Sequence, residues 1–336
     1  MIKEYKSIDT FQEVLFSKMN EAKSIAISGH VRPDGDCLGA CLGMYHYIQS
    51  KYKEEQKQVD VYLESVPESF EYLLGNAKVR TSITESKNYD LFISLDCGSL
   101  DRLGFSEELF QNAKETICID HHISNTLFAD CNYVEGEASS TCEILTALID
   151  ESDLNLEIAN AFYTGIVHDT GVFKHSNTKR RTMELAGRLI NQGVNTSKII
   201  DGSFYQKTYM QNQILGRSLL ESMLVLDGRC ICCSISRKQM DFYQAKPHDL
   251  DGIIDQLRVT KGVEVAILIY ELASKEFKVS MRSNEIVDVC AIAQYFGGGG
   301  HIRAAGCTMK GSAHDVINNI TLHIENQLKN ADRVRE

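Results

Sequence analysis

The stretch that decides the fold is SIAISGHVRPDGDCLGACLGMYHYIQSKYK, residues 24–53. It opens with a continuous apolar run at 24–29, which is typical of a strand buried on both faces of a parallel sheet. A polar turn follows, and a helical pattern begins after Asp36. The turn places His30, Asp34 and Asp36 within seven residues. We therefore expect a strand–helix unit whose connecting loop carries either ordinary turn chemistry or a divalent metal.

Three further apolar runs of the same kind follow, QVDVYL at 58–63, YDLFISLD at 89–96 and ETICID at 115–120, with helical patterns between them. This alternation predicts an α/β domain built on a parallel sheet. Asp96 ends the third run, and Asp120, His121 and His122 end the fourth. Ligands of open α/β sheets bind beyond the carboxyl ends of the strands, so we expect these polar clusters to converge. Asp169 ends the helical segment LEIANAFYTGIVHD at 156–169 and is expected to join them.

The composition of the chain changes in the stretch 191–215, which is polar and rich in amide side chains and which we interpret as a connector. It separates a domain at 1–190 from a smaller α/β domain at 216–330. The runs RCICCSIS, VEVAILIYELA and EFKVSMRS of the second domain are expected to form strands.

Composition narrows the class of protein. With 336 residues, 43% hydrophobic and 24% charged, the chain is typical of a globular protein of about two domains. No apolar run reaches the length of a membrane span, and the first residues lack the layout of a signal peptide, so we expect a cytoplasmic protein without membrane contact. The eleven cysteines, lying mostly in apolar segments, are expected to be buried thiols. A net charge of −11 argues against binding of long duplex nucleic acid but allows a short anionic substrate.

The candidate metal ligands combine carboxylates with imidazoles: His30, Asp34, Asp36, Asp96, His121 and Asp169. Such donors suit Mn²⁺ or Mg²⁺, and also Co²⁺ or Fe²⁺, better than a structural zinc, which usually collects cysteines. Six ligands suit a two-metal site with ions about 3.5–4 Å apart. Taken singly, each residue has a structural interpretation as a turn, cap or helix end. Cys37, Cys97 and His168 adjoin the ligands, but we do not expect them to take part, because neighbours on a strand face opposite ways.

Five motifs resemble one known family. HVRPDGD, DCGSLDR, DHH and HDTGVF are similar to the four motifs of the DHH phosphoesterases, and GGGGHIRAAG resembles the glycine-rich motif of the DHHA1 domain. The resemblance implies an N-terminal parallel-sheet DHH domain, a smaller C-terminal α/β DHHA1 domain and an active site in the cleft between them. Ala40 is a departure, since relatives often carry serine there.

The resemblance also implies roles for the residues. The six ligands would hold two divalent cations, Mn²⁺ by family preference, with Asp96 bridging them. Two catalytic residues follow: Asp120 would orient a ligand histidine or support the ligands from behind, and His122 would face the scissile phosphate.

The second domain is expected to hold the substrate. Backbone N–H groups of Gly298, Gly299 and Gly300 would approach an anion closely, and His301 and Arg303 would contact a terminal phosphate. Arg282 and Arg258 are weaker candidates, since exposed arginines at strand ends are common. Aromatic residues that could stack on a base, such as Phe173 and Tyr295, are not separable from core residues by sequence.

Among DHH phosphoesterases the chain most resembles bacterial NrnA-type enzymes. The implied function is hydrolysis of short oligoribonucleotides, from dinucleotides to pentanucleotides, and of 3′-phosphoadenosine 5′-phosphate to AMP by metal-activated water. The implied assembly is a homodimer.

Other functions stay open. They are a phosphodiesterase for cyclic or linear dinucleotides, an exonuclease of the RecJ type and a non-catalytic nucleotide sensor. The acidic charge disfavours the exonuclease, and the intact ligand set disfavours the sensor. A related inorganic pyrophosphatase is disfavoured by the glycine-rich ending.

Overall fold

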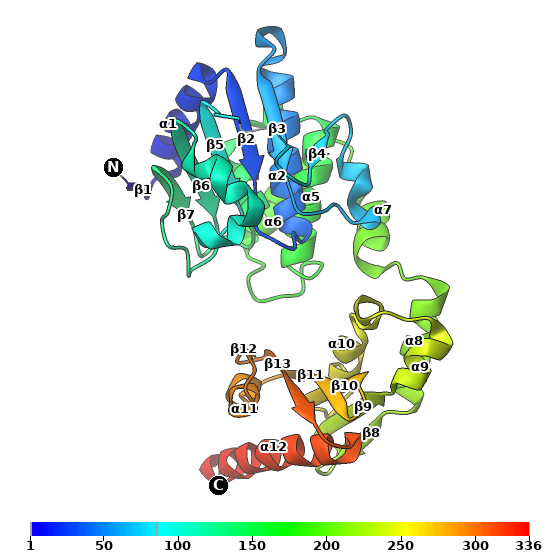
Figure 1. Cartoon of the computed structure of the whole chain (residues 1–336). Helices are drawn as coiled ribbons and strands as arrows, with labels where there is room; N and C mark the ends of the chain where they lie inside the picture. Colours follow the sequence, from blue (N-terminus) through cyan, green and yellow to red (C-terminus); the bar gives the residue numbers. More distant parts are fainter. Residues whose placement is uncertain (1, 85–86, 336) are drawn as a thin grey trace. The chain divides into compact units, whose positions relative to one another are not determined.

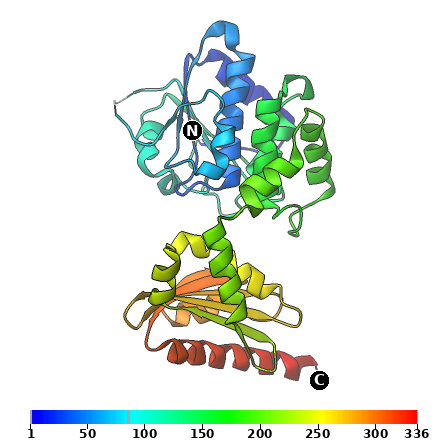
Figure 2. The same ribbon diagram turned by 90° about the vertical axis from the view of Figure 1, so that its right-hand side faces the viewer.

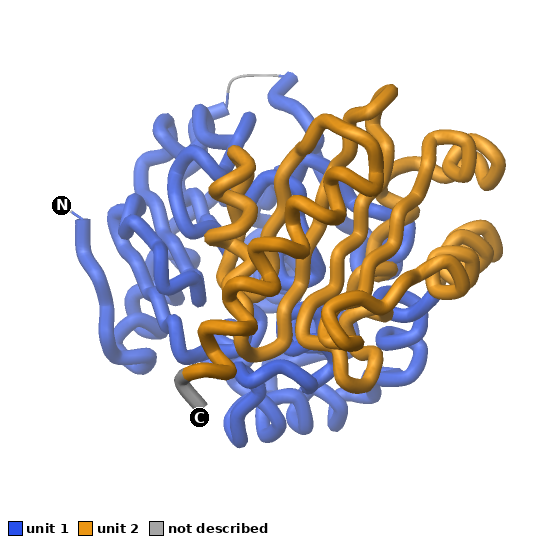
Figure 3. The backbone as a smooth tube through the Cα atoms, turned by 90° about the horizontal axis from the view of Figure 1, so that it is seen from below, with its two compact units in different colours: residues 1–206 blue, residues 207–336 orange. Residues whose placement is uncertain are grey.

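The structure, a computed structural model, describes residues 2–84 and 87–335. The chain divides between Gln206 and Lys207 into two compact units, coloured blue and orange in Figure 3. This division falls inside the stretch 191–215 that we interpreted as a connector. Its first part packs on unit 1, where α7 (Thr196–Ile200) contacts α5 (Leu156–Asp169). The domain limits themselves, and the cleft expected between the domains, stay predictions.

Unit 1 is built on a seven-stranded sheet in which every pairing is parallel. The strands lie in the order β1-β7-β6-β5-β2-β3-β4. Their bounds are β1 (Lys3–Tyr5), β2 (Ser24–Ser28), β3 (Gln58–Tyr62), β4 (Val79–Arg80), β5 (Leu91–Leu95), β6 (Glu115–Asp120) and β7 (Cys131–Val134). The four apolar runs fold as β2, β3, β5 and β6, so the prediction of a parallel-sheet domain is confirmed.

Both faces of this sheet are covered, as the continuous apolar runs require. Besides α5 and α7, the α-helices are α1 (Ile8–Glu21), α2 (Gly35–Lys51), α3 (Glu107–Gln111), α4 (Thr141–Leu148) and α6 (Arg180–Ile190). Figure 1 labels α1, α2 and α6 among them. Ile25 and Ile27 of β2 pack into the core that contains α1, α2, α4 and α5. Ala26, between them, points to the other face, toward α3.

The order in which successive strands are added to the sheet reverses at β2. The chain passes from β2 to its neighbour β3 on one side, and later returns to β5 on the other side of β2. Loops that leave two adjacent strands toward opposite sides open a crevice at the carboxyl edge of the sheet, where ligands of such folds bind. His30 follows β2 and Asp96 follows β5, so both lie at this crevice.

Helices α2 and α5 pack unusually closely because glycines line their contact. A Cβ atom on Gly39 would lie 2.4 Å from the carbonyl oxygen of Ala161, and one on Gly43 would lie 2.4 Å from the ring of Phe162. A Cβ on Gly165 of α5 would lie 2.5 Å from Asp36 Oδ1. Only hydrogen fits at these positions. The absence of side chains therefore lets Asp36 and Asp169, carried by different helices, reach one site.

Unit 2 is built on a mixed six-stranded sheet in the order β12-β13-β11-β10-β9-β8, with β9 and β10 parallel and the other neighbours antiparallel. The strands are β8 (Met223–Val225), β9 (Cys230–Ile235), β10 (Val265–Ala273), β11 (Glu276–Ser283), β12 (Gly299–His301) and β13 (Ala304–Lys310). The helices are α8 (Tyr209–Leu220), α9 (Arg237–Tyr243), α10 (Ile253–Arg258), α11 (Val289–Tyr295) and α12 (Ala313–Arg335).

Different helices cover the two faces of this second sheet. Helices α11 and α12 cover one face, and α12 runs along it in Figure 2. The other face packs against α8, α9 and α10 over β9 and β10. The expected smaller α/β domain is thereby confirmed. Among residues 2–84 and 87–335, no helix has both the length and the apolar character needed to span a bilayer.

Candidate metal centre

The loop after β2 is fixed by the start of α2. The carboxylate of Asp34 accepts the backbone N–H groups of Asp36 and Cys37, both at 3.1 Å, and so caps the helix. His30 Nδ1 donates to the carbonyl of Val31 at 2.9 Å. Its Nε2 is thereby left facing the carboxylates. Asp34 Oδ2 is 3.7 Å from this Nε2.

Asp96 lies at the centre of the site. Its Oδ2 is 3.5 Å from Nε2 of His30, and its Oδ1 is 3.5 Å from Nε2 of His121. Thr141 Oγ1 donates to the same Oδ1 at 3.1 Å. The Asp96 backbone is left-handed, with a φ of 54°, a strained conformation that aspartate tolerates better than most residues. One carboxylate thus faces both histidines, as a bridging ligand would.

A second group of donors gathers around His121. Its Nε2 is 3.1 Å from Asp169 Oδ2 and 4.0 Å from Asp36 Oδ2. The fully buried Asp36 accepts two backbone N–H groups from the first turn of α4, from Thr141 at 2.6 Å and Cys142 at 2.9 Å. Each carboxylate oxygen keeps a second lone pair for a metal ion. The six residues proposed as ligands therefore lie together.

The structure adds one donor that the sequence analysis set aside. One donor atom from each of His30, Cys37 and Asp96 lies within 4.8 Å of the others. Cys37 lies on α2 rather than on a strand, so the argument from strand alternation does not apply to it.

The crowding of several carboxylates raises pKa values within this cluster. Burial alone would lower the pKa of His30, but the carboxylates of Asp34 and Asp96 raise it to about 12. Burial would also lower the pKa of His121, but the carboxylates of Asp169 and Asp36 raise it to about 10. Burial and the neighbouring Asp96 raise the pKa of Asp36 to about 7. Without a cation, protons therefore balance the buried charge. Because the six proposed ligands are carboxylates and imidazoles, the cluster fits hard divalent cations.

A polar triad stands next to this cluster. Asp120 Oδ1 accepts the backbone N–H of His121 at 2.9 Å and lies 2.7 Å from Nδ1 of His122. Asn125 donates to Asp120 Oδ2 at 2.7 Å. The hydrogen bond to Asp120 raises the pKa of His122, although burial opposes the change. The side chain of His122 is 40% exposed. Asp120 therefore orients His122, whose Nε2 is directed away from this hydrogen bond.

Sequence reasoning missed three partners of the site residues, two of ligands and one of Asp120. Asn125 fixes Asp120, the Thr141 hydroxyl contacts Asp96, and the start of α4 holds Asp36. The start of α4 had a detectable signal, because Ser140 caps the helix by accepting the N–H of Glu143. Asn125 had none.

The glycine-rich motif of unit 2 forms the hairpin β12–β13. A Cβ on Gly298 would lie 2.2 Å from the carbonyl oxygen of Gly306, and Gly300 has a φ of 146°, so both positions need glycine to close the hairpin. Gly299 has open space beside its Cα. His301 is exposed and pairs with Ala304, which in turn pairs with Arg282. His301, Ala304 and Arg282 therefore lie in one row across three strands.

The three candidate arginines of unit 2 all have partners within the chain. Arg303 donates to the carbonyl of Val287 at 3.0 Å and to that of Glu285. Arg258 donates to Asn284 at 2.8 Å. The guanidinium groups of Arg258 and Arg282 come within 4 Å of Asp255. Their proposed role in phosphate binding stays a prediction.

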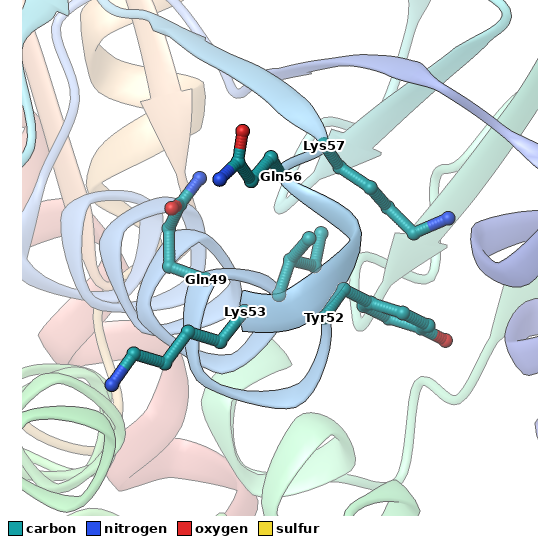
Figure 4. A pocket seen from close by; sticks show the side chains of 6 residues that line it. Gln49, Tyr52, Lys53, Gln56 and Lys57 are labelled. Carbon is teal, nitrogen blue, oxygen red and sulfur yellow. The ribbon is translucent and has the colours of Figure 1, made fainter.

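A pocket at the far end of α2 does not belong to this site. Gln49, Tyr52, Lys53, Gln56 and Lys57 line it, as Figure 4 shows. Asp36 and Lys51 lie at opposite ends of α2, about 22 Å apart at 1.5 Å per residue. The ammonium group of Lys57 is already bonded to the carbonyls of Asn20 and Ala22.

The fold and the cluster define a class: α/β proteins with a carboxylate–histidine metal centre at the switch point of a parallel sheet. Residues 24–166 match the model of the DHH family, N-terminal domain, and residues 234–330 match that of the DHHA1 domain. The chain therefore carries an N-terminal domain of the DHH family followed by a DHHA1 domain.

Named relatives cover most of the chain. The bifunctional oligoribonuclease and PAP phosphatase NrnA of Thermus thermophilus is 29% identical over 85% of this chain and 84% of its own length. The protein of the same name from Bacillus subtilis is 23% identical, with 85% and 89% covered. An exopolyphosphatase-related protein from Bacteroides fragilis, 22% identical, superposes with a TM-score of 0.83 over 95% of this chain and 96% of its own, which shows a shared fold.

Proposed function

We propose that this protein is a two-metal phosphoesterase that hydrolyses short oligoribonucleotides to mononucleotides, and 3′-phosphoadenosine 5′-phosphate to AMP. The observation that carries the proposal is the position of Asp96, which faces His30 with one oxygen and His121 with the other. The names of the NrnA relatives supply the substrates.

The metal ligands in this proposal form two groups that share Asp96. His30, Asp34 and Asp96 would hold one cation, and Asp36, Asp96, His121 and Asp169 the other. Mn²⁺ is the proposed metal, with Mg²⁺ and Co²⁺ as alternatives. Bound cations would lower the pKa of a water nucleophile and stabilise charge on the phosphoryl oxygens.

Protonation of the leaving group is assigned to His122 and its two supporting side chains. His122, held by Asp120, keeps a proton more readily than a free histidine because the Asp120 carboxylate raises its pKa. It would donate that proton to the oxygen that leaves the phosphorus. Asn125 fixes the other oxygen of Asp120 and thereby the ring orientation.

Substrate binding is assigned to the hairpin of unit 2. Gly299 leaves room for an anion near the backbone. His301 offers an exposed ring, and Arg303 an exposed positive charge. Arg282 lies in the same row as His301, and Arg258 adds charge near it. These groups would contact the terminal phosphate of a short substrate.

One assay tests the proposal. Metal-free protein is supplied with Mn²⁺ and offered a dinucleotide, a pentanucleotide, a 24-mer, 3′-phosphoadenosine 5′-phosphate and a cyclic dinucleotide in parallel. We expect rapid release of mononucleotides from the two short oligomers, phosphate release from 3′-phosphoadenosine 5′-phosphate, and little cleavage of the 24-mer. Preferential cleavage of the cyclic dinucleotide would replace this function with a signalling phosphodiesterase. Binding without turnover of any substrate would indicate a sensor.

The homodimer and the cytoplasmic location complete the proposal. Sedimentation analysis of the full chain tests the first, and cell fractionation tests the second.

A further inference from the structure

A group of aromatic rings in tilted and edge-to-face contact lies beside the metal centre and has no part in the function described so far. It consists of Phe70, His168, Phe204 and Tyr205, which we call the aromatic wall. The ring of His168 is 4.9 Å from that of Phe70 and 5.4 Å from that of Phe204. The rings of Phe204 and Tyr205 are 5.2 Å apart and nearly perpendicular.

The wall directly adjoins the ligands. The His168 ring lies so close to Gly35 that a Cβ there would be 2.3 Å from its Cγ. Gly35 stands between Asp34 and Asp36, and His168 precedes Asp169. His168 is thus in contact with a residue bonded to two proposed ligands and is itself bonded to a third.

The outer rings of the wall are exposed. Phe204 is 38% and Tyr205 58% exposed, whereas Phe70, on the other side of the contact with His168, is buried. Both outer residues belong to a π-helical turn, Asp201–Tyr205, a conformation that often occurs at functional sites. His168 Nε2 lies 3.0 Å from Ser203 Oγ, which itself donates to the carbonyl of Ile199. These bonds anchor the turn to α5.

We propose that the aromatic wall binds a nucleobase of the substrate, with Phe204 and Tyr205 as the stacking surface. This inference rests on the proposed function, because a base lies one ribose away from the phosphate that the metals would hold. Stacking accepts any base, since every base has a π-face, and it favours purines. A protein partner fits less well, because a stable interface needs about 800 Å² per partner, far more than two rings provide.

The two aromatic residues suggested by sequence fit this role less well. Phe173 packs on the core and faces Tyr163 at 6.1 Å. Tyr295 is exposed, but its ring already lies in tilted contact with that of His323 of α12, 4.5 Å away, in unit 2. The wall was not visible in the sequence because its members come from 3-10, α-helical and π-helical segments far apart in the chain.

The experiment compares substrates with and without a base. Phe204→Ala and Tyr205→Ala are assayed with Mn²⁺ on the dinucleotide ApA and on dinucleotides abasic at the 5′ or the 3′ position. Phe242→Ala, which removes a 78% exposed ring from α9, is the matched control. Thermal unfolding checks that each variant is folded.

We expect Phe204→Ala to raise KM for ApA about 5- to 150-fold, the range produced by loss of one base–aromatic stack, with a smaller change in kcat. KM for the dinucleotide abasic at the stacked position should not change. Phe204→Trp should restore KM, and 2-aminopurine ribonucleotide fluorescence should be quenched by wild type and Phe204→Trp but less by Phe204→Ala.

Two results would overturn the inference while leaving the phosphoesterase intact. One is an equal loss on ApA and both abasic substrates, which would mean that the wall only positions the ligands. The other is no effect of either alanine variant while wild type cleaves ApA. If wild type with Mn²⁺ cleaves neither ApA nor the abasic substrates, the proposed function fails and the base site with it.

Discussion

The metal centre of unit 1 and the hairpin of unit 2 are constructed in opposite ways. At the metal centre the ligands are mostly buried, and helix starts fix two of the carboxylates. On the hairpin His301 and Arg303 are exposed, and the glycines serve first to close the turn. Several like charges can be held together only by a rigid framework, whereas an end group can be recognised by an open surface. We therefore expect substitutions in unit 1 to abolish function and those in unit 2 to weaken binding.

The largest effect should follow Asp96→Asn. Asparagine keeps the shape and tolerates the left-handed backbone, so the loss should be chemical rather than conformational. We expect dinucleotide hydrolysis to fall by about 10³-fold or more and titration calorimetry to lose one Mn²⁺ site. Asp60→Asn is the control, because Asp60 is a buried carboxylate of the same sheet that bonds Tyr89 and Arg80 outside the site. Two wild-type Mn²⁺ sites in Asp96→Asn would contradict the bridging role.

His122→Gln should have the next largest effect. It removes the titratable ring held by Asp120 but no proposed ligand, so kcat should fall about 10²-fold while Mn²⁺ binding is kept. The decrease should shrink for a substrate whose leaving group needs no proton, such as p-nitrophenolate. An equal decrease on both kinds of substrate would exclude a role in proton donation.

Gly165→Ala tests the framework rather than the ligands. Its new methyl group would lie 2.5 Å from Asp36 Oδ1 and 2.3 Å from Cys142 Sγ, so we expect the free energy of unfolding to fall by about 1–3 kcal/mol and Mn²⁺ binding to weaken. Gly187→Ala on α6 is the matched control, because nothing lies within 4 Å of its Cβ position. Urea unfolding measures both variants. Equal stability of the two would show that the helices can separate without cost.

On the hairpin, His301→Ala and Arg303→Ala should differ. His301→Ala should raise KM roughly tenfold, the loss of about one charge-assisted hydrogen bond, and leave the melting temperature unchanged. Arg303→Ala should raise KM and also lower the melting temperature, since its guanidinium bonds the carbonyls of Val287 and Glu285. If neither variant changes KM, the hairpin does not bind the substrate.

The smallest effect concerns pH. The raised pKa values of Asp36, about 7, Asp169, about 6, and His121, about 10, give stability that is present at low pH and is lost as pH rises through those values. Asp34, with its pKa lowered to about 2, acts in the opposite sense and only in acid. Burial lowers the pKa of His168 to about 4, so this residue also acts in the opposite sense below its ordinary pKa of 6.5. The other shifts together outweigh it, and metal-free protein should therefore lose stability as the pH rises from 5 to 8.

Added Mn²⁺ should raise the melting temperature by more at pH 8 than at pH 6, because a cation replaces protons that are easier to remove at higher pH. Scanning fluorimetry with chelator or Mn²⁺ measures the difference. A larger gain at pH 6 would contradict the displacement of protons.

Much of this site was predictable from the sequence. The strands at 24–28 and 115–120 are continuous apolar runs, and parallel strands end at one edge, so His30 and Asp120 had to lie near each other. Five of the six candidate ligands were chosen by this logic, and Asp169 was added because it ends a helical segment; the structure brings all six together.

The parts of the fold and site that were not predicted depend on long-range contacts, which leave no local pattern in the sequence. β1 is three residues long and exists through its pairing with β7, more than a hundred positions away. Asn125 bonds Asp120 from a loop, and Arg303 bonds carbonyls near position 286, which only the folded chain brings close. Such partners follow from tertiary structure rather than from periodicity.

The backbone N–H groups of α4 that hold Asp36 have one further consequence. Because these N–H groups already hold the carboxylate in place, capture of a cation would require little rearrangement of this part of the protein. Loss of the ion's own hydration shell would then limit the rate of loading. Mg²⁺ gives up its water reluctantly, so a preformed site of this kind would favour other cations by speed of uptake as well as by affinity.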